Sequence, residues 1–287
     1  MKKRFATFLI GFFWIHSCVF GYNLELNLSY DYFRGMPDGS WNGNSGLLAA
    51  ANFGVDLYEG INGQVGGSYG LYNWNGRANL QFKNPKQVEQ QGFVTAGFFA
   101  TIQQEYSAGL VYDRLFTRNF GIYGVDPNFD QLRFHLGYQI CREEIGMWGT
   151  VRLQTAHRRA LGLPVRFRAI NQLNLFWTHF FDNCASTLLW AGVPYGESLE
   201  HRHGRPGNFI AGFALRAPLM ERLFIDGYGS YMSPRHGHGL KETRNYAANV
   251  CIGVTYLFGE GICDCAESRL MPIANHANLL VDTNFNL

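Results

Sequence analysis

Apolar and polar residues alternate along most of this chain, beginning at residue 22. In the first such stretch Leu24, Leu26 and Leu28 fall on one side, whereas Glu25 and Asn27 fall on the other. Successive side chains of a β-strand point to opposite faces, so this stretch predicts a strand with one apolar and one polar face. The pattern recurs as far as residue 258 and predicts an all-β chain.

We predict twelve strands from this alternation. Their approximate ranges are 22–33, 46–58, 61–74, 92–103, 106–113, 130–141, 145–155, 166–180, 184–194, 208–217, 223–232 and 245–258. The connections between them alternate in length. The long ones are 34–45, 75–91, 114–129, 156–165, 195–207 and 233–244, and the short ones are 59–60, 104–105, 142–144, 181–183 and 218–222. Strict alternation with an even strand number predicts a closed, antiparallel, up-and-down transmembrane β-barrel whose two ends lie on one side.

The first residues have the composition of an export signal. Lys2, Lys3 and Arg4 precede an apolar stretch over 5–15, and small residues near Gly21 offer a cleavage site. We therefore predict a signal peptide over 1–21, an outer-membrane barrel over 22–258 and a periplasmic tail over 259–287. Two alternatives stay open: Cys18 as a lipidated first residue, and a tail that folds back into the barrel mouth.

Composition agrees with a barrel in a membrane. Only 16% of residues are charged, 16% are aromatic, and 34 are glycine. After the signal, no apolar run approaches the roughly 20 residues that a membrane-spanning helix needs. A lipid-facing band of apolar residues with aromatic rims needs such a composition. Loss of the three basic residues of the signal changes the formal charge from +2 to −1, so net charge favours no class of partner.

The last predicted strand carries a pattern of its own. Gly253, Tyr256 and Phe258 have the spacing of the terminal signal that the outer-membrane assembly machinery recognises in many barrels. We therefore expect that machinery and outer-membrane lipid to be partners of the chain.

Three blocks of sequence carry a more specific resemblance. They are Phe-Arg-Gly-Met-Pro-Asp-Gly-Ser-Trp over 33–41, Glu-Gln-Gln-Gly-Phe over 89–93, and Asn-Gln-Leu-Asn-Leu-Phe-Trp over 171–177. Over most of 22–258 the chain resembles an uncharacterised, porin-like family of bacterial outer-membrane barrels. The resemblance implies fold and location but no chemistry.

The alternation also predicts which charged residues line the lumen. These are Glu25, Asp31, Asp56, Arg133, His135, Arg152, Arg168, Arg216 and Asp226. Acidic residues concentrate on the first two strands and basic residues on the sixth to eighth, which face each other in a ring of twelve. An acidic wall opposite a basic wall would orient dipolar solutes. Alternatively, these charges pair across a plugged lumen and only stabilise it.

Histidines and cysteines raise two further possibilities. Five histidines fall on long connections: His157, His201, His203, His236 and His238. They would add positive charge to a basic mouth at low pH, and the alternative of a metal site on the two His-x-His pairs is weakened by neighbouring arginines. Four cysteines are candidates for a disulfide in an oxidising compartment: Cys141, Cys184, Cys263 and Cys265. The first two are too far apart to pair directly, so the tail pair would reach one of them or another envelope protein.

The sequence carries no signature of an enzyme, a cofactor site or a nucleic-acid site. Ser186 and His179 lie on neighbouring strands, but alternation turns them to opposite faces, and no Gly-rich phosphate loop occurs. We expect a porin-like outer-membrane channel for small polar or anionic solutes. The alternative is a non-conducting structural or surface-interaction barrel that displays its loops and is linked to envelope partners through cysteines.

Overall fold

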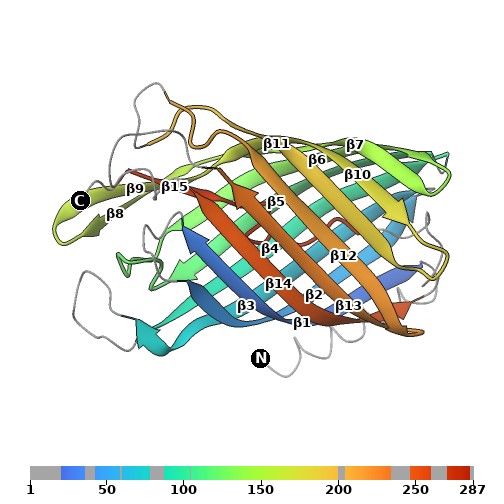
Figure 1. Ribbon diagram of the computed structural model, residues 1–287, viewed down its shortest axis with the longest axis horizontal. Helices are drawn as coiled ribbons and strands as arrows, with labels where there is room; N and C mark the ends of the chain where they lie inside the picture. The colour runs from blue at the N-terminus through green and yellow to red at the C-terminus, as the bar shows by residue number, and fades with distance from the viewer. Residues whose placement is uncertain are drawn as a thin grey trace, which may run out of the picture.

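The computed structural model describes residues 21–35, 43–58, 60–77, 87–103, 105–199, 204–233, 246–259 and 270–284. Twelve strands close into an antiparallel barrel (Figure 1). They are β1 (Tyr22–Gly35), β2 (Asn44–Tyr58), β3 (Ile61–Arg77), β4 (Gln87–Ile102), β5 (Tyr106–Arg118), β6 (Asn128–Ile140), β7 (Glu143–Arg152), β10 (Asn171–Phe180), β11 (Ser186–Tyr195), β12 (Ile210–Met220), β13 (Leu223–Met232) and β14 (Ala247–Gly259). The remaining strands form a small sheet in the order β15 (Val281–Thr283), β9 (Leu163–Ala169) and β8 (Thr155–Ala160).

The barrel is closed by its first and last strands. β1 pairs with β2 along one edge and with β14 along the other, where the register runs from Asn23 opposite Gly259 to Gly35 opposite Ala247. Each other barrel strand pairs with the barrel strands that precede and follow it in the chain. The predicted fold class, a twelve-stranded up-and-down transmembrane barrel, is confirmed.

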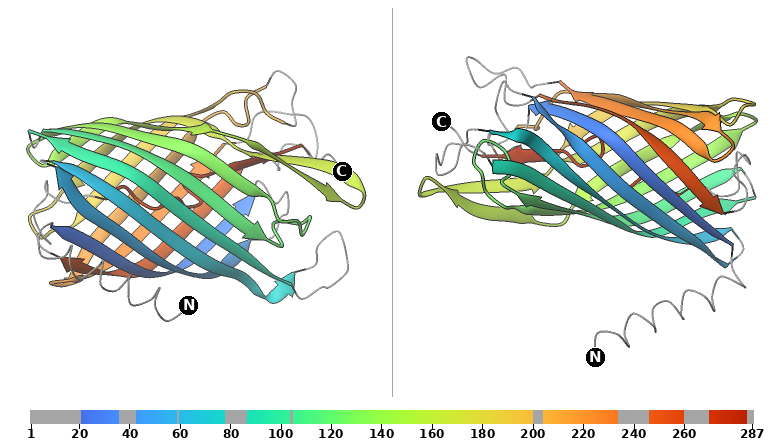
Figure 2. Two further views of the ribbon diagram at one scale, coloured as in Figure 1. Left: turned by 180° about the vertical axis from the view of Figure 1, so that it is seen from behind. Right: turned by 90° about the horizontal axis from the view of Figure 1, so that it is seen from below.

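One predicted strand is in fact two. The pattern over 166–180 predicts a single strand, but β9 ends at Ala169 and β10 begins at Asn171. Between them, the Ile170 amide donates to the Leu280 carbonyl at 2.8 Å instead of joining the barrel ladder. The long connection predicted over 156–165 is therefore a hairpin, β8–β9, which projects from one end of the barrel (Figure 2).

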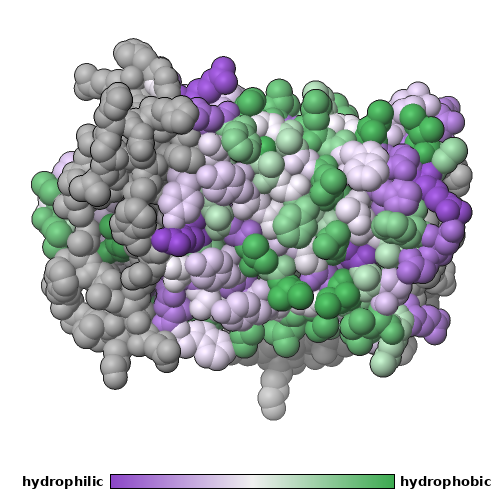
Figure 3. Space-filling view, in the orientation of Figure 1, coloured by the Kyte–Doolittle hydropathy of each residue, from purple (hydrophilic) through white to green (hydrophobic). Residues whose placement is uncertain are grey.

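The outside of the barrel is apolar. Large side chains such as Leu28, Phe98 and Leu175 are between 55% and 66% exposed, although they lie in the middle of strands. Figure 3 shows apolar side chains over the middle of the barrel wall and polar ones gathered toward its rim. A continuous apolar belt of this kind is unstable in water and is the surface that a transmembrane barrel presents to lipid.

Aromatic side chains mark both rims of this belt. Tyr58 and Tyr106 are exposed beside the short turns, and Trp74 and Tyr231 are exposed near the opposite strand ends. Tyr and Trp prefer the boundary between lipid and water, because a ring with a polar tip satisfies both phases.

Within the part of the chain that the structure describes, no helix is long and apolar enough to cross a membrane.

The C-terminal segment returns through the barrel. β14 ends at Gly259, at the end with the short turns, whereas β15 pairs with β9 at the end with the long connections. Residues 270–280 lie between these two points and contact the inner wall (Figure 2). The described part of the tail, residues 270–284, therefore folds back into the barrel, which is the second of the two predicted courses, and this corrects the periplasmic placement for these residues.

Candidate functional site: a lumen occupied by the C-terminal segment

The inner wall of the barrel is polar where it meets the C-terminal segment. Asn52, Gln64, Gln91, Thr95 and Gln131 project inward from β2, β3, β4 and β6, and each is no more than 6% exposed. Alternation places these side chains in the lumen for the same reason that it places their apolar neighbours on the lipid side. A buried amide or hydroxyl needs a hydrogen-bond partner, and on this wall the segment provides many of them.

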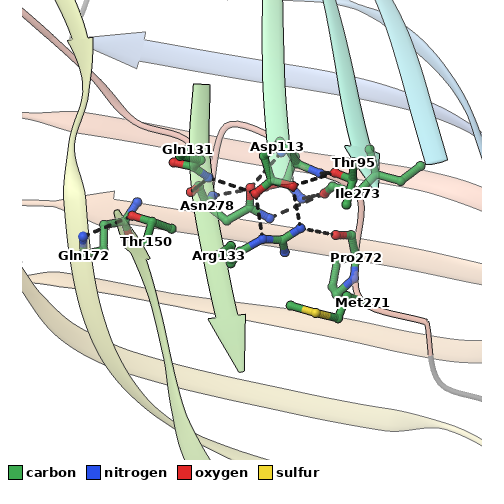
Figure 4. Close-up of polar contacts among 12 residues, drawn as sticks. Thr95, Asp113, Gln131, Arg133, Thr150, Gln172, Met271, Pro272, Ile273 and Asn278 are labelled. Carbon is green, nitrogen blue, oxygen red and sulfur yellow. Dashed lines mark hydrogen bonds and ion pairs between the residues drawn. The ribbon is translucent and has the colours of Figure 1, made fainter. Parts of the chain in front are cut away.

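Asp113 is the centre of a polar network on this wall (Figure 4). Its carboxylate is 0% exposed and accepts from Nε and Nη2 of Arg133 at 2.9 and 3.1 Å. It also accepts from the Thr95 hydroxyl at 2.7 Å and from the Gln131 amide at 3.0 Å. Four hydrogen bonds compensate the cost of burying this charge.

The same three partners of Asp113 hold the C-terminal segment. Arg133 Nη2 donates to the Pro272 carbonyl at 2.5 Å, and Gln131 donates to the Asn278 carbonyl at 3.0 Å. The Thr95 hydroxyl accepts from the Ala274 amide at 2.8 Å. Asp113 therefore orients the side chains that contact the segment without contacting it itself.

His276 attaches the segment closer to the end of the barrel with the long connections. Its Nδ1 lies 2.7 Å from Asp31 Oδ2, and its Nε2 lies 2.7 Å from Gln91 Oε1. The ring also stacks on Phe33, with centroids 4.1 Å apart. Asp31 receives a second hydrogen bond from the Tyr72 hydroxyl at 3.0 Å. Within the described segment, His276 thus binds the barrel wall through its side chain rather than its main chain.

Apolar packing closes the end of the barrel that carries the long connections. One buried cluster joins the inner wall, the connection between β5 and β6, the β8–β9 hairpin and the segment; its members include Phe93, Phe120, Tyr123, Phe167, Leu279 and Val281. Asp282 adds polar anchors, since its carboxylate accepts from the Leu199 amide at 2.7 Å and lies 3.5 Å from Arg168. Burial lowers the pKa of the Arg168 guanidinium, the charge of Arg152 lowers it further, and Asp282 opposes this shift.

Between the segment and the end of the barrel with the short turns, part of the lumen is unfilled. A cavity of about 450 Å³ extends from residues 270–275 to strand ends at Asn23 and Gly259, on the side of the short turns. Arg216 faces this cavity and is neutralised by Glu25 at 3.1 Å and by Asp226 at 2.7 Å. We call this cavity the vestibule. The lumen therefore has a vestibule at the end with the short turns and is closed by the apolar cluster at the end with the long connections.

A second polar cluster lines the vestibule near the short turns. The Ser107 hydroxyl donates to Glu144 Oε1 at 2.5 Å and lies 3.1 Å from His135 Nε2. The His135 ring stacks on Phe176, with centroids 4.7 Å apart. Glu144 Oε1 also lies 3.4 Å from His135 Nε2. Ser107 and Glu144 thus meet the same imidazole nitrogen, whereas in a hydrolytic triad the serine and the carboxylate meet different nitrogens.

His179 does meet a carboxylate, which the sequence analysis did not foresee. Its Nδ1 lies 2.6 Å from Glu143 on the outer face of the barrel. Ser186 is in register with Phe180, the residue next to His179, so the serine and the histidine do point to opposite faces. Ser186 therefore does not lie beside this pair.

The structure distributes the predicted lumen charges unevenly. Glu25, Asp31, Arg133, His135, Arg216 and Asp226 have the contacts described above, and Arg152 is half-buried at the end of β7. Asp56 is exposed beside a short turn. Arg168 lies on β9, outside the barrel wall, which corrects its predicted place on a barrel strand. Arg133 meets its carboxylate on the neighbouring strand β5, so this pair does not span two opposite walls.

The structure describes only part of the predicted histidine and cysteine sets. His157 is exposed on β8, whereas His201, His203, His236 and His238 lie outside the described residues. Cys141 is free and exposed, Cys251 is free and buried, and Cys184 is in a disulfide. Cys263 and Cys265, its predicted partners, also lie outside the described residues. Among the described residues no group of three or more His, Cys, Asp and Glu side chains is placed to hold a metal ion.

The proposed assembly signal does lie on the strand that closes the barrel. Tyr256 and Phe258 point outward from β14, 40% and 37% exposed, with ring centroids 4.6 Å apart. Gly253 faces inward against Ser29, where a Cβ would overlap the β1 backbone. Recognition of this strand by the assembly machinery stays a prediction.

Most residues that hold the segment escaped the sequence analysis. It sought charged lumen residues, whereas the contacts come mainly from neutral side chains such as Asn52, Gln64 and Gln131. The available signal was a run of amides at inward positions of β2 to β6, together with an apolar stretch close to the C-terminus.

Comparison with protein families places the chain. A model described as a family of unknown function, DUF6666, matches residues 12–281. The chain belongs to this family. A comparison with curated proteins finds no match.

Several solved outer-membrane structures share the general architecture. Outer membrane phospholipase A from Escherichia coli is 9% identical, with 81% of this chain and 95% of that chain covered and a TM-score of 0.44. The P. putida toluene transporter TodX is 10% identical, with 83% and 90% covered and a TM-score of 0.44. The KdgM porin in complex with disordered oligogalacturonate is 8% identical, with 81% and 98% covered and a TM-score of 0.46. At these identities the likeness concerns architecture and says nothing of activity or solute.

Proposed function

We propose that this protein is an outer-membrane channel for small polar solutes and that its own C-terminal segment holds it closed. The observation that carries this proposal is the polar inner wall along the path of the segment. Asn52, Gln64, Thr95 and Gln131 are buried there and bond the segment through hydrogen bonds. Once the segment leaves, the same groups would bind water, and a hydrated polar path would connect the two ends of the barrel.

Energetics supports a removable plug over a permanent filling. Burying amides and a carboxylate costs free energy unless every group finds a partner, and an apolar filling would avoid that cost. A wall that must also face water gains from polar side chains. The vestibule of about 450 Å³ already leaves space in the half of the lumen on the side of the short turns.

Three features support placement in the outer membrane. The barrel has an apolar belt with aromatic rims, its strand number is even with both barrel ends on one side, and the sequence begins with an export-signal pattern. These are the properties of bacterial outer-membrane barrels. Cleavage of the signal at residue 21, and links to other envelope proteins through cysteines, remain part of the proposal.

Selectivity for anions finds little support in the described charges. We expected Arg133, Arg152 and Arg168 to attract anions, but Arg133 and Arg168 each lie within 3.5 Å of a carboxylate that offsets the charge. We therefore keep small polar solutes as the proposed class and leave out the preference for anions.

One observation favours a second function, that of a non-conducting barrel. The apolar cluster that contains Phe120, Phe167 and Val281 seals the mouth, and apolar packing of this kind is costly to open. A barrel sealed for good would serve only as a stable platform for its outer loops.

Conductance in planar lipid bilayers separates the two functions. We expect the full chain to be closed for most of the time, with brief openings, and a chain ending at residue 269 to conduct steadily. The truncated chain retains all twelve barrel strands, and the heat-dependent shift of folded barrels on gels checks that it has folded. His276→Ala in the full chain, which removes the bonds to Asp31 and Gln91, should raise the open fraction. A folded truncated barrel and a His276→Ala variant that both stay closed would establish the platform.

A further inference from the structure

The inner wall recognises the main chain of the segment. The Gln64 amide donates to the Met271 carbonyl at 2.5 Å and accepts from the Met271 amide at 2.8 Å. One side-chain amide thus pairs with both main-chain groups of one residue, as a neighbouring strand would. Asn52 adds a second donor to the same carbonyl at 3.2 Å. None of these contacts involves the Met271 side chain.

Main-chain contacts continue along the segment. The wall engages the Pro272 carbonyl, the Ala274 amide and the Asn278 carbonyl through Arg133, Thr95 and Gln131. The Leu280 carbonyl then accepts from the Ile170 amide, and residues 281–283 join β9 as a strand. Hydrogen bonds to the main chain give affinity for extended peptides that depends little on their sequence.

The wall is also shaped to admit a peptide. Gly54, Gly66 and Gly109 face inward where the segment passes. A Cβ at these positions would overlap the side chains of Leu270, Ile273 and Met271 respectively. Three inward glycines from β2, β3 and β5 therefore form a groove for the side chains of the occupant.

Much of this surface is organised by the barrel itself. Thr95, Gln131 and Arg133 are oriented by Asp113, and all four belong to the barrel wall. The network therefore keeps its internal bonds when the segment is absent. A site that is organised before its ligand arrives spends less free energy on ordering when it binds.

We propose that the lumen is a binding site for oligopeptides and that the C-terminal segment, which makes a turn over residues 275–279, occupies it as a tethered competitor. The proposal rests on the proposed function, because it names the solute class of that channel. A saccharide of similar size offers hydroxyl groups but not the adjacent N–H and C=O groups that Gln64 pairs with. The vestibule gives a peptide access from the end with the short turns.

The test uses the full chain with His276→Ala, which loosens the segment but leaves Gln64, Thr95, Gln131 and Arg133 in place. Three compounds are added on the vestibule side of a planar bilayer: a peptide with the sequence of residues 270–284, a scrambled peptide of the same composition, and a linear oligosaccharide of similar mass. We expect both peptides to block the current, with half-blocking concentrations within about tenfold of each other, and the saccharide to have no effect.

Two glutamine variants on this background locate the site. Gln64→Leu removes two hydrogen bonds and should raise the half-blocking concentration of both peptides about tenfold or more. Gln172→Leu is the matched control, because Gln172 is equally buried in the lumen wall and its amide nitrogen has no hydrogen-bond partner. It should leave the half-blocking concentration unchanged. Equal effects of the two substitutions would overturn the assignment of Gln64.

Peptide binding can also be measured without a current. The assay is fluorescence anisotropy of the scrambled peptide with the His276→Ala variant in detergent micelles. Binding without any current would overturn the channel and leave the peptide site. A current that neither peptide alters would overturn the peptide site and leave the channel. Block by the 270–284 peptide alone would show a plug that fits only its own sequence, and equal block by the saccharide would show a pore without preference for peptides; both outcomes overturn the inference.

Discussion

Asp113 shows at the scale of one residue how the lumen is held together. Its carboxylate is fully buried and satisfied by four hydrogen bonds from Thr95, Gln131 and Arg133. Buried ion pairs often add little net stability, because desolvation offsets their attraction. The Asp113–Arg133 pair instead fixes the direction of side chains that bond the C-terminal segment, so its main contribution is to geometry.

Removal of this carboxylate should be costly. Asp113→Ala leaves the Arg133 guanidinium buried with the Pro272 carbonyl as its remaining described partner, and we expect a loss of about 3–5 kcal/mol in unfolding free energy. Asp182→Ala is the matched control, because Asp182 pairs with Arg142 in an exposed turn and should cost no more than about 1 kcal/mol. Urea unfolding in lipid bilayers, followed by tryptophan fluorescence, measures both. Equal losses would show that burial of the Asp113 pair is unimportant.

The three described cysteines should differ in reactivity. Cys141 is exposed, Cys251 is 4% exposed, and Cys184 is in a disulfide. A maleimide should therefore modify Cys141 in the folded protein, Cys251 only after unfolding, and Cys184 only after unfolding and reduction. Peptide mapping by mass spectrometry reports each site separately, with Cys141→Ser as the control. Modification of Cys251 as fast as Cys141 in the folded protein would contradict its buried position.

The C-terminal segment shows how one element uses different contacts along its length. Near Met271 it is bound through its main chain, at His276 through a side chain, and at Leu279–Val281 through apolar packing and a short ladder with β9. Opening the lumen requires all three kinds of contact to break. The His276 contact is the one that a single substitution removes without altering the wall.

The position of β15 predicts where the C-terminus lies. β15 pairs with β9 at the end of the barrel with the long connections, which in bacterial barrels faces the outside of the cell. An epitope tag appended to the C-terminus should therefore bind antibody on intact cells. The same tag inserted at Asn183, in a short turn, should bind only after the outer membrane is permeabilised. The opposite result would place the C-terminus in the periplasm.

Local patterns account for what the sequence predicted at this scale. Alternation and turn residues act within a few positions, so the twelve barrel strands were foreseen. The start of β4 and the end of β5 were each misplaced by about five residues, and β10 was merged with β9. The small sheet was not foreseen, because β15 meets β9 across more than a hundred residues of chain. Gln64 and Met271 are even farther apart, at 207 residues along the chain. Strand patterns carry no information about which neutral amide meets which distant main chain.

The charge of the whole lumen differs from the sequence-based picture. Among the described barrel residues, the inward carboxylates are those of Glu25, Asp31, Asp56, Glu89, Asp113, Glu144 and Asp226, and the inward guanidinium groups are those of Arg133, Arg152 and Arg216. Glu89, Asp113 and Glu144 were missed because they lie at the predicted ends of strands or within predicted connections, where register was not assigned. Carboxylates therefore outnumber guanidinium groups, and the expected acidic and basic walls are replaced by local pairs.

An opened lumen should for this reason prefer cations, against the preference predicted from sequence. Fixed negative charges in a narrow pore concentrate cations and repel anions. The reversal potential of the chain ending at residue 269, measured in a salt gradient, should have the sign of cation flow. The double substitution Asp31→Asn and Glu89→Gln should move the reversal potential toward zero. Both carboxylates lie in the lumen near the end with the long connections. Asp130→Asn is the control, because Asp130 faces the outer side of β6 and bonds Tyr112. Anion flow in the truncated barrel would show instead that Arg152, together with Arg133 despite its Asp113 partner, dominates the pore.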